Sequence, residues 1–140
     1  MNATTITTQR PPTLVNFIII GLLQAGVALY FAIKLIINTS AFTGSIPVSM
    51  YVTPALVVVA VVGILLTAVH KRVGLMVGSA TWLISLVLTV VGLIQNMSQV
   101  IPDLRTLDYI VVAGTIILDL FMLYRFYRYA THEPEKSYFN

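Results

Sequence analysis

The sequence predicts an all-α integral membrane protein in which four transmembrane helices form an antiparallel bundle. Hydrophobic residues make up 58% of the 140-residue chain and charged residues only 9%. The apolar residues are gathered in four long runs, whereas a soluble domain needs about 25% charged residues to cover its surface. The outer surface is therefore expected to face lipid, with one transmembrane domain over residues 14–129.

The four apolar runs are long enough to cross a membrane as helices. A helix that spans ~30 Å of hydrocarbon needs ~20 apolar residues. Long runs without alternation are not half-buried strands, and an open strand would leave backbone groups unpaired in lipid. We expect helices at about residues 14–37, 54–70, 74–95 and 107–127. Thr53 and Pro54 resemble an N-cap followed by proline, so the second helix is expected to begin there.

The basic residues predict how the chain is oriented. Cytoplasmic loops of membrane proteins are rich in Lys and Arg. With the N-terminal segment 1–13 inside, most basic residues lie on the inner side: Arg10, Lys71, Arg72, Arg125, Arg128 and Lys136, against Lys34 and Arg105 outside. Both termini are therefore expected in the cytoplasm, and a prokaryotic cell membrane is the expected location. Four of these residues are expected to anchor the helices at the inner interface: Lys71, Arg72, Arg125 and Arg128.

Two connecting segments have a predicted character. The first outer loop, residues 38–53, is expected to be the longest connection and is unusually apolar. The polar tail, residues 130–140, ends in two aromatic residues before Asn140. An unanchored tail is usually frayed, and the aromatic residues leave docking as the alternative.

Small residues recur along the predicted helices at spacings of three and four, which places them on one face. Membrane helices pack closely through such residues. The first helix carries Gly21, Ala25, Ala28 and Ala32, and the third carries Gly74, Gly78, Thr81, Ser85 and Gly92. The pattern fits packing within one bundle, and it also fits docking of another protein or a second copy.

Asp119 is the one charged residue in the apolar run from residue 109 to residue 124. Counting ~1.5 Å per residue from the inner ends of the helices places it at a similar depth to Gln24 and Trp82. Thr115 lies one turn away on the same face. We expect Asp119 to point into the bundle toward Gln24 and to be protonated, because burial away from water favours the neutral carboxyl group. An ionisable residue at this depth is a candidate functional residue.

The residue types argue against several kinds of chemistry. The chain has no cysteine, which excludes thiolate metal sites and iron–sulfur clusters. Its two histidines, His70 and His132, fall at or beyond the inner surface, so haem ligation inside the bundle is not expected. We therefore expect no catalytic residues, no cofactor and no metal. The net charge of +3 reflects orientation, and no nucleic-acid partner is expected.

Three functions remain after these exclusions. The first is a non-catalytic accessory subunit of a larger membrane protein complex, for example a respiratory-chain complex. The alternative is a small homo-oligomeric proton-coupled transporter or channel that uses Asp119, and a transient assembly factor is a third possibility. The expected partners are the lipid bilayer and either a larger membrane protein or a second copy of the chain.

Overall fold

A computed structural model describes residues 10–46, 48–98, 106–133 and 135–139. These residues form four α-helices and two short 3-10 helices, with no strand among them. The helices are α1 (Leu14–Thr43), η1 (Val48–Tyr51), α2 (Val52–Ala68), α3 (Arg72–Met97), α4 (Thr106–Thr131) and η2 (Glu135–Tyr138). The predicted all-α membrane fold is confirmed. Helices α1, α3 and α4 are long and apolar enough to cross a membrane, and α2 is a shorter apolar helix.

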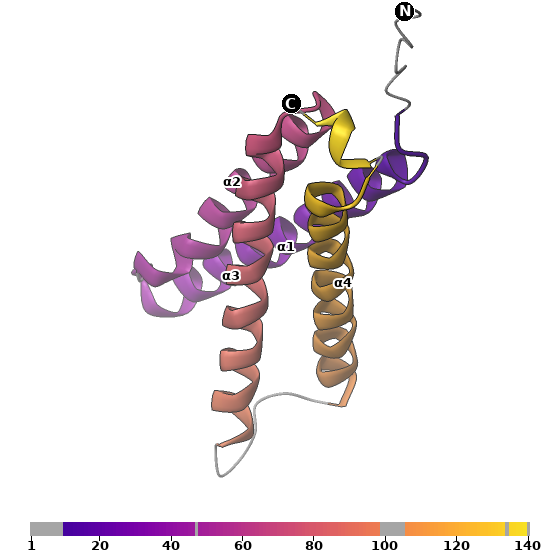
Figure 1. The fold of residues 1–140 in the computed structure, drawn as a ribbon. Coiled ribbons are helices and arrows are strands. Elements are labelled where there is room, and N and C mark those ends of the chain that lie inside the picture. Colours follow the sequence, from indigo (N-terminus) through magenta and orange to yellow (C-terminus); the bar gives the residue numbers. More distant parts are fainter. Residues whose placement is uncertain (1–9, 47, 99–105, 134, 140) are drawn as a thin grey trace, which may run out of the picture.

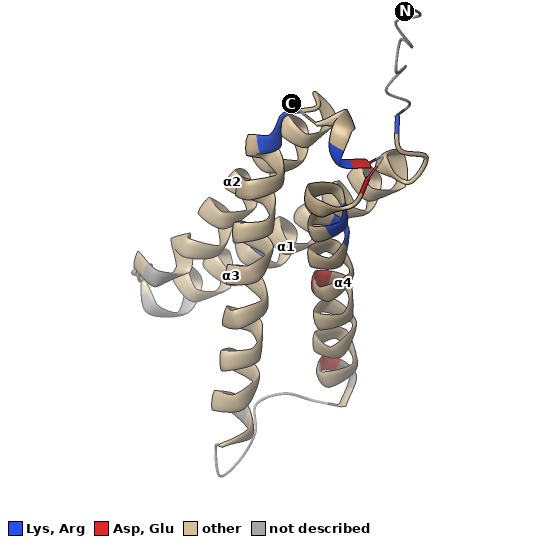
Figure 2. Cartoon of the chain, in the orientation of Figure 1, with Lys and Arg blue, Asp and Glu red and all other residues tan. Residues whose placement is uncertain are grey.

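The helices meet at one end of the molecule and diverge toward the other. The start of α1, the α2–α3 turn and the C-terminal tail lie together at the top of Figure 1. Most Lys and Arg positions gather at this end, which we call the basic end (Figure 2). We call the half of the bundle nearest to it the inner half and the other half the outer half. Away from the basic end, the pair α1–α2 separates from the pair α3–α4 (Figure 1).

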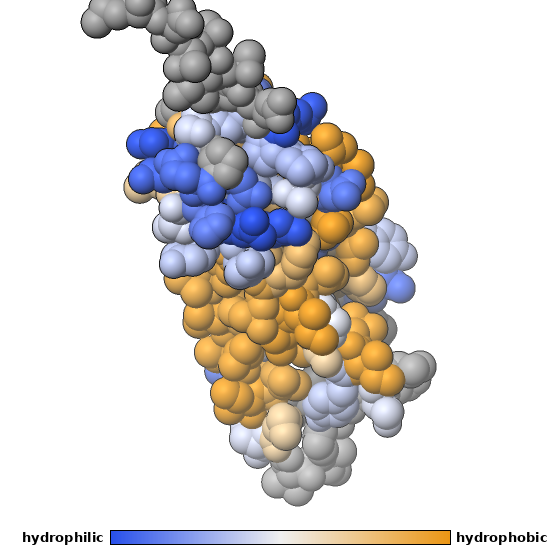
Figure 3. Space-filling view, turned by 45° about the vertical axis from the view of Figure 1, so that its right-hand side comes forward, coloured by the Kyte–Doolittle hydropathy of each residue, from blue (hydrophilic) through white to orange (hydrophobic). Residues whose placement is uncertain are grey.

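An apolar belt covers the middle of the molecule. In the space-filling view, hydrophobic side chains fill this belt, and hydrophilic residues gather at the basic end (Figure 3). Exposed Val, Ile and Leu side chains occur on all four α-helices. A surface of this kind is expected where lipid is the solvent, because exposure of an apolar side chain to lipid has no hydrophobic cost.

Helix α1 is longer than predicted. It continues beyond residue 37 to Thr43 and is terminated by Gly44, whose left-handed conformation (φ 67°) lets its N–H bond to the Ser40 carbonyl. The predicted outer loop 38–53 was therefore wrong in large part, because it contains the end of α1, all of η1 and the start of α2. Polar residues do not stop a helix, whereas a left-handed glycine does.

The predicted N-cap of α2 was also wrong. The helix begins at Val52, and its N-cap residue is Tyr51, which makes no side-chain cap hydrogen bond. Pro54 instead lies in the first turn of the helix. The N–H groups there have no intrahelical partner, so proline loses no hydrogen bond.

A tight turn joins α2 to α3 at the basic end. His70 has a left-handed backbone (φ 64°). Its N–H bonds to the Thr67 carbonyl at 3.1 Å, and the Lys71 N–H bonds to the Leu66 carbonyl at 2.9 Å. This pair of bonds is a Schellman motif, which usually has glycine at the left-handed position. The turn makes α2 and α3 an antiparallel hairpin.

Glycines bring the helix backbones together in the inner half. A Cβ atom at Gly74 would lie 2.3 Å from the backbone nitrogen of Thr67, and one at Gly63 would lie 2.9 Å from that of Gly78. A Cβ at Gly78 would lie 2.3 Å from the ring of Phe126 on α4. Only glycine fits at such distances, so α2, α3 and α4 pack tightly here.

Aromatic side chains fill the space between the helices near the basic end. Phe17 of α1 lies edge-on to Phe126 and Tyr129 of α4, with ring centroids 4.9 and 5.3 Å apart. The Thr13 and Tyr129 hydroxyls are hydrogen-bonded at 2.8 Å. All three aromatic side chains are buried. This inner core therefore closes the inner half of the bundle.

Candidate functional site

Three polar side chains from three different helices meet in the middle of the bundle. The indole Nε1 of Trp82 on α3 donates to Oε1 of Gln24 on α1 at 3.2 Å. The amide Nε2 of Gln24 in turn donates to Oδ1 of Asp119 on α4. The structure thus brings together the three residues that counting along the helices had placed in one layer. We call Gln24, Trp82 and Asp119 the polar layer.

Asp119 is completely buried, and only one of its two oxygens is paired. The side chain has 0% exposure. Ser85 of α3 also faces the carboxyl group. Nevertheless, Oδ2 has no hydrogen-bond partner in the described part of the chain. A buried polar atom without a partner is costly, and such atoms in native proteins usually have a functional or ligand-related reason.

A cavity of about 460 Å³ lies on the outer side of the polar layer. Its lining residues lie between Ile20 and Phe31 on α1, Thr53 and Ala60 on α2, Thr81 and Thr89 on α3, and Val111 and Asp119 on α4. These stretches are 8 to 12 residues long, or roughly 11–17 Å along a helix. The cavity therefore occupies the outer half of the bundle, and the polar layer is its floor.

Most of the cavity wall is apolar. Leucine, valine and isoleucine side chains from all four helices line it. The hydroxyls of Thr81, Thr89 and Thr115 each donate to the carbonyl four residues earlier in their own helix. Thr115 therefore lines the cavity without bonding to Asp119. Ligand sites commonly have this composition, with an apolar wall and a few convergent polar groups.

Asp119 is the only titratable side chain among the described residues that line the cavity. The nearest basic residue along α4 is Arg125, whose guanidinium lies over the ring of Phe121 at 5.4 Å from its centroid. A cation–π contact of this kind stabilises the positive charge of an arginine. The cavity floor thus carries an acidic group without a basic partner from its own walls.

The small residues predicted to pack the helices divide between the two halves. Gly21, Ala25 and Ala32 are buried, and a Cβ at Gly21 would lie 2.7 Å from Ile64 and Met122 side-chain atoms. Gly74 and Gly78 pack against neighbouring helices, as described above. Ala28, Thr81 and Ser85 line the cavity.

Gly92 does not have the packing role that its spacing predicted. It is exposed, and a Cβ added there would meet no atom within 4 Å. The small-residue stripe of α3 runs past the point where the helices diverge, so its outer end has no packing partner among the described residues.

The basic residues predicted as interface anchors lie at or near the basic end, and three of them have a partner. Arg72 Nε donates to the Phe139 carbonyl at 3.2 Å. Arg128 forms an ion pair with Glu135 at 3.1 Å. Arg125 contacts Phe121 as described above, and Lys71 is exposed.

The C-terminal tail is folded against the helices. Phe139 is buried against Tyr129, with ring centroids 5.5 Å apart. The Tyr138 hydroxyl is hydrogen-bonded to Nε2 of His70 at 2.9 Å. Of the two alternatives for the tail, the structure therefore shows docking, with the chain's own basic end as the binding surface. Sequence reasoning missed the role of His70, although the two terminal aromatic residues were a signal.

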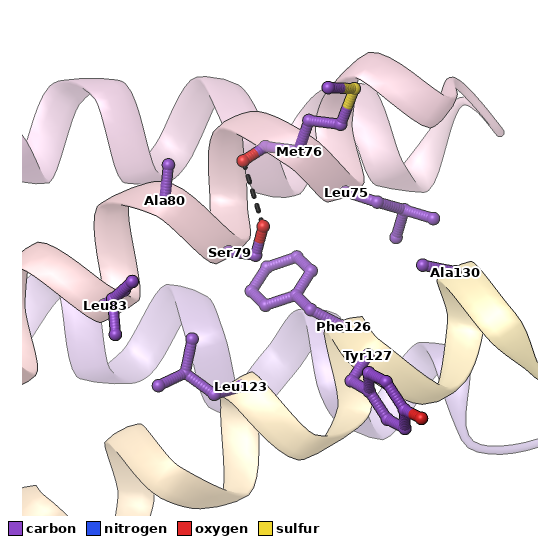
Figure 4. A pocket seen from close by; sticks show the side chains of 9 residues that line it. All are labelled: Leu75, Met76, Ser79, Ala80, Leu83, Leu123, Phe126, Tyr127 and Ala130. Carbon is purple, nitrogen blue, oxygen red and sulfur yellow. Dashed lines mark hydrogen bonds between the residues drawn. The ribbon is translucent and has the colours of Figure 1, made fainter.

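A second hollow, of about 410 Å³, lies between α3 and α4 in the inner half. Figure 4 shows Phe126 directed between the two helices, with Leu75, Leu83 and Leu123 around it. The hydroxyl of Ser79 donates to the Met76 carbonyl at 3.0 Å and is thus satisfied within α3. Its lining is mainly apolar, with Leu, Met, Ala and Phe side chains.

Comparison with known proteins found no matching family model, no similar curated protein and no similar solved structure. Any function has to be argued from the site itself, because a helical bundle alone is compatible with many functions.

Proposed function

We propose that the protein binds a small solute in the outer cavity and carries it across the membrane, with Asp119 as the coupling residue. One observation carries this proposal: the floor of the cavity is a buried carboxyl group, one oxygen of which has no hydrogen-bond partner among the described residues. The cavity volume of about 460 Å³ lies within the range of small-molecule sites.

The two halves of the bundle have the properties that a carrier requires. In the outer half, the cavity reaches as far as the polar layer. On the other side of this layer, the aromatic residues of the inner core fill the space between the helices. A carrier opens its site to one side at a time, and we propose that the outer half is the open side in this structure. Four helices enclose little space, so we propose that the carrier acts as a symmetric oligomer.

Single-cysteine labelling tests this proposal, and the chain contains no native cysteine that would interfere. Ser85→Cys places a thiol at the cavity floor, and Ile84→Cys places one on the neighbouring residue, whose side chain is 46% exposed on the outside of the bundle. Both variants are treated with a membrane-impermeant maleimide in oriented vesicles. For a carrier, Ser85→Cys should react from both sides, and Ile84→Cys should be protected by lipid.

The labelling experiment also separates the alternatives. A thiol at position 85 that reacts from the outer side alone would indicate a static binding site. If Ser85→Cys reacts no faster than Ile84→Cys from either side, water does not reach the cavity, and the carrier proposal is wrong.

A second candidate is the non-catalytic subunit of a larger membrane complex. It is favoured by the arrangement of α1 and α4, whose backbones come close at few points. A helix of another protein would then fill the outer cavity in place of a solute. Purification of the tagged protein in mild detergent, followed by native mass spectrometry, distinguishes the two. Stoichiometric recovery of a larger membrane protein supports the subunit, and recovery of self-assemblies alone supports the carrier.

A further inference from the structure

The polar layer and the walls of the outer cavity also indicate the chemical class of the solute. This inference rests on the proposed function, in which the cavity binds a solute. We infer that the ligand is a small organic ammonium ion, whose N–H groups bind Asp119 and whose apolar body lies in the outer cavity. Three features of the site lead to this inference.

The first feature is the charge of the site. Asp119 is the only titratable group among the described cavity-lining residues, and Arg125 is held over Phe121. An isolated carboxylate in an apolar site is strongly disfavoured, so the empty site is expected to hold a proton on Asp119. An anionic solute would find no cation here, whereas a cationic solute would provide the missing partner.

The second feature is hydrogen bonding. Gln24 donates to Oδ1 of Asp119 and Ser85 faces the carboxyl group, but Oδ2 has no hydrogen-bond partner among the described residues. An ammonium group carries N–H donors that can fill this position. Gln24 is only partly buried, whereas Asp119 is fully buried. The Gln24 side chain therefore has to move aside for the ligand to reach the carboxylate.

The third feature is the wall. Trp82 and Phe31 line the cavity beside residues such as Leu56, Leu88 and Val111. Aromatic faces attract organic cations, and apolar walls accept the carbon body of an amine. A hydrated metal ion would instead need several oxygen ligands, and the hydroxyls of Thr81, Thr89 and Thr115 donate to their own helices.

Binding of the ammonium ion and of the proton is mutually exclusive at one carboxyl group. When the ligand binds, the proton on Asp119 leaves to water, and the carboxylate pairs with the ammonium N–H. Charge is conserved in this exchange, with one proton released for each cation bound. If this exchange takes place at the inner side and its reverse, proton binding with amine release, takes place at the outer side, export of one amine is coupled to entry of one proton.

The test uses three probes with the same six-carbon chain and different head groups: hexylammonium, hexanol and hexyl sulfate. Trp82 is the only tryptophan of the chain and belongs to the polar layer, so its fluorescence reports binding directly. The full-length protein in lipid nanodiscs is titrated with each probe. Proton release is measured with a pH indicator in weakly buffered solution.

Hexylammonium is expected to bind at least roughly tenfold more tightly than hexanol, with about one proton released per ligand. Asp119→Asn should remove the preference and the proton release. Asp108→Asn, which changes the other acidic residue of α4, should leave both unchanged. Proton release from the unmodified protein keeps the test decisive if Asp119→Asn fails to fold.

Two other results would overturn the inference in distinguishable ways. Equal binding of hexanol and hexylammonium without proton release would refute the ammonium ligand but would leave the solute-binding proposal intact. If no probe binds although Ser85→Cys is labelled, the chemical class is wrong and the cavity serves another solute. If no probe binds and Ser85→Cys is also unreactive, both proposals are wrong.

Discussion

The inner and outer halves of this bundle are built from the same residue types but are packed in opposite ways. In the inner half, the glycines lie against neighbouring backbones, and Phe17, Phe126 and Tyr129 fill the remaining space. In the outer half, Gly26, Gly92 and Gly114 have no neighbouring atom within 4 Å of an added Cβ. Composition alone thus does not make an interface, because close packing also requires that the opposing surfaces converge.

The difference has a consequence for stability. Lipid is as apolar as a protein core, so membrane helices are held together by packing and hydrogen bonds rather than by release from water. Most of this packing is in the inner half, and the polar layer marks its boundary. We therefore expect substitutions in the inner half to change the free energy of unfolding more than matched substitutions in the outer half.

The largest decrease in the free energy of unfolding is expected for Gly74→Ala. The added methyl group would overlap backbone atoms of α2, which cannot move without separating the helices. Unfolding in mixed detergent micelles, followed by circular dichroism, should show a loss of about 3 kcal/mol. Gly92→Ala on the same helix is the matched control and should be neutral or stabilising by up to ~1 kcal/mol. Equal losses at the two positions would contradict the proposed difference between the halves.

A smaller loss, of about 2 kcal/mol, is expected for Phe126→Ala. The substitution leaves a cavity beside Gly78, and the lost packing is not compensated by the lipid. Leu88→Ala, at an exposed position that lines the outer cavity, should cost less than ~0.5 kcal/mol. The same micelle unfolding assay compares the two, and a larger loss for the Leu88 variant would reverse the assignment of the core.

Tyr138→Phe tests whether the tail contributes to the inner half. The substitution removes the hydrogen bond to His70 and keeps the aromatic ring, so a loss of about 1 kcal/mol is expected. Tyr127→Phe, at a position with 66% exposure, is the control and should be neutral. Limited proteolysis provides an independent measurement, since a released tail would be cleaved faster. Unchanged cleavage and stability would show that the docked tail is not held by this bond.

The smallest change in the free energy of unfolding is expected for Thr115→Val. The hydroxyl bonds only to the Val111 carbonyl of its own helix, and the side chain borders open space in the outer half. The change in stability should be below ~0.5 kcal/mol. A destabilisation above 1 kcal/mol would show that Thr115 has a partner in the outer half, for example in a second copy of the chain.

Part of the site could be predicted by counting. Gln24, Trp82 and Asp119 lie at similar distances from the inner ends of their helices, and the rise per residue of a helix hardly varies. Depth in the bundle can therefore be read from the sequence. The hydrogen bonds from Trp82 to Gln24 and from Gln24 to Asp119 also required that the three side chains face one another, which depends on the rotation of each helix.

Other features could not be predicted because they depend on contacts between distant segments. The tail docks through Tyr138 and Phe139 because the turn at His70 and the end of α4 lie side by side at the basic end. The length of α1 was underestimated because hydropathy marks where the membrane ends and not where the helix ends. The cavity was not foreseen, since no sequence pattern reports the angle at which helix pairs diverge.

The sequence by itself determined that the chain forms helices apolar enough for a membrane and that one carboxyl group lies near the middle of the last helix. These properties follow from the length and polarity of the apolar runs and from the fixed rise of a helix. Only the tertiary structure decided which small residues pack, where the cavity lies and what the tail contacts. Lipid does not favour one apolar helix face over another, so these choices are made by the fit between surfaces.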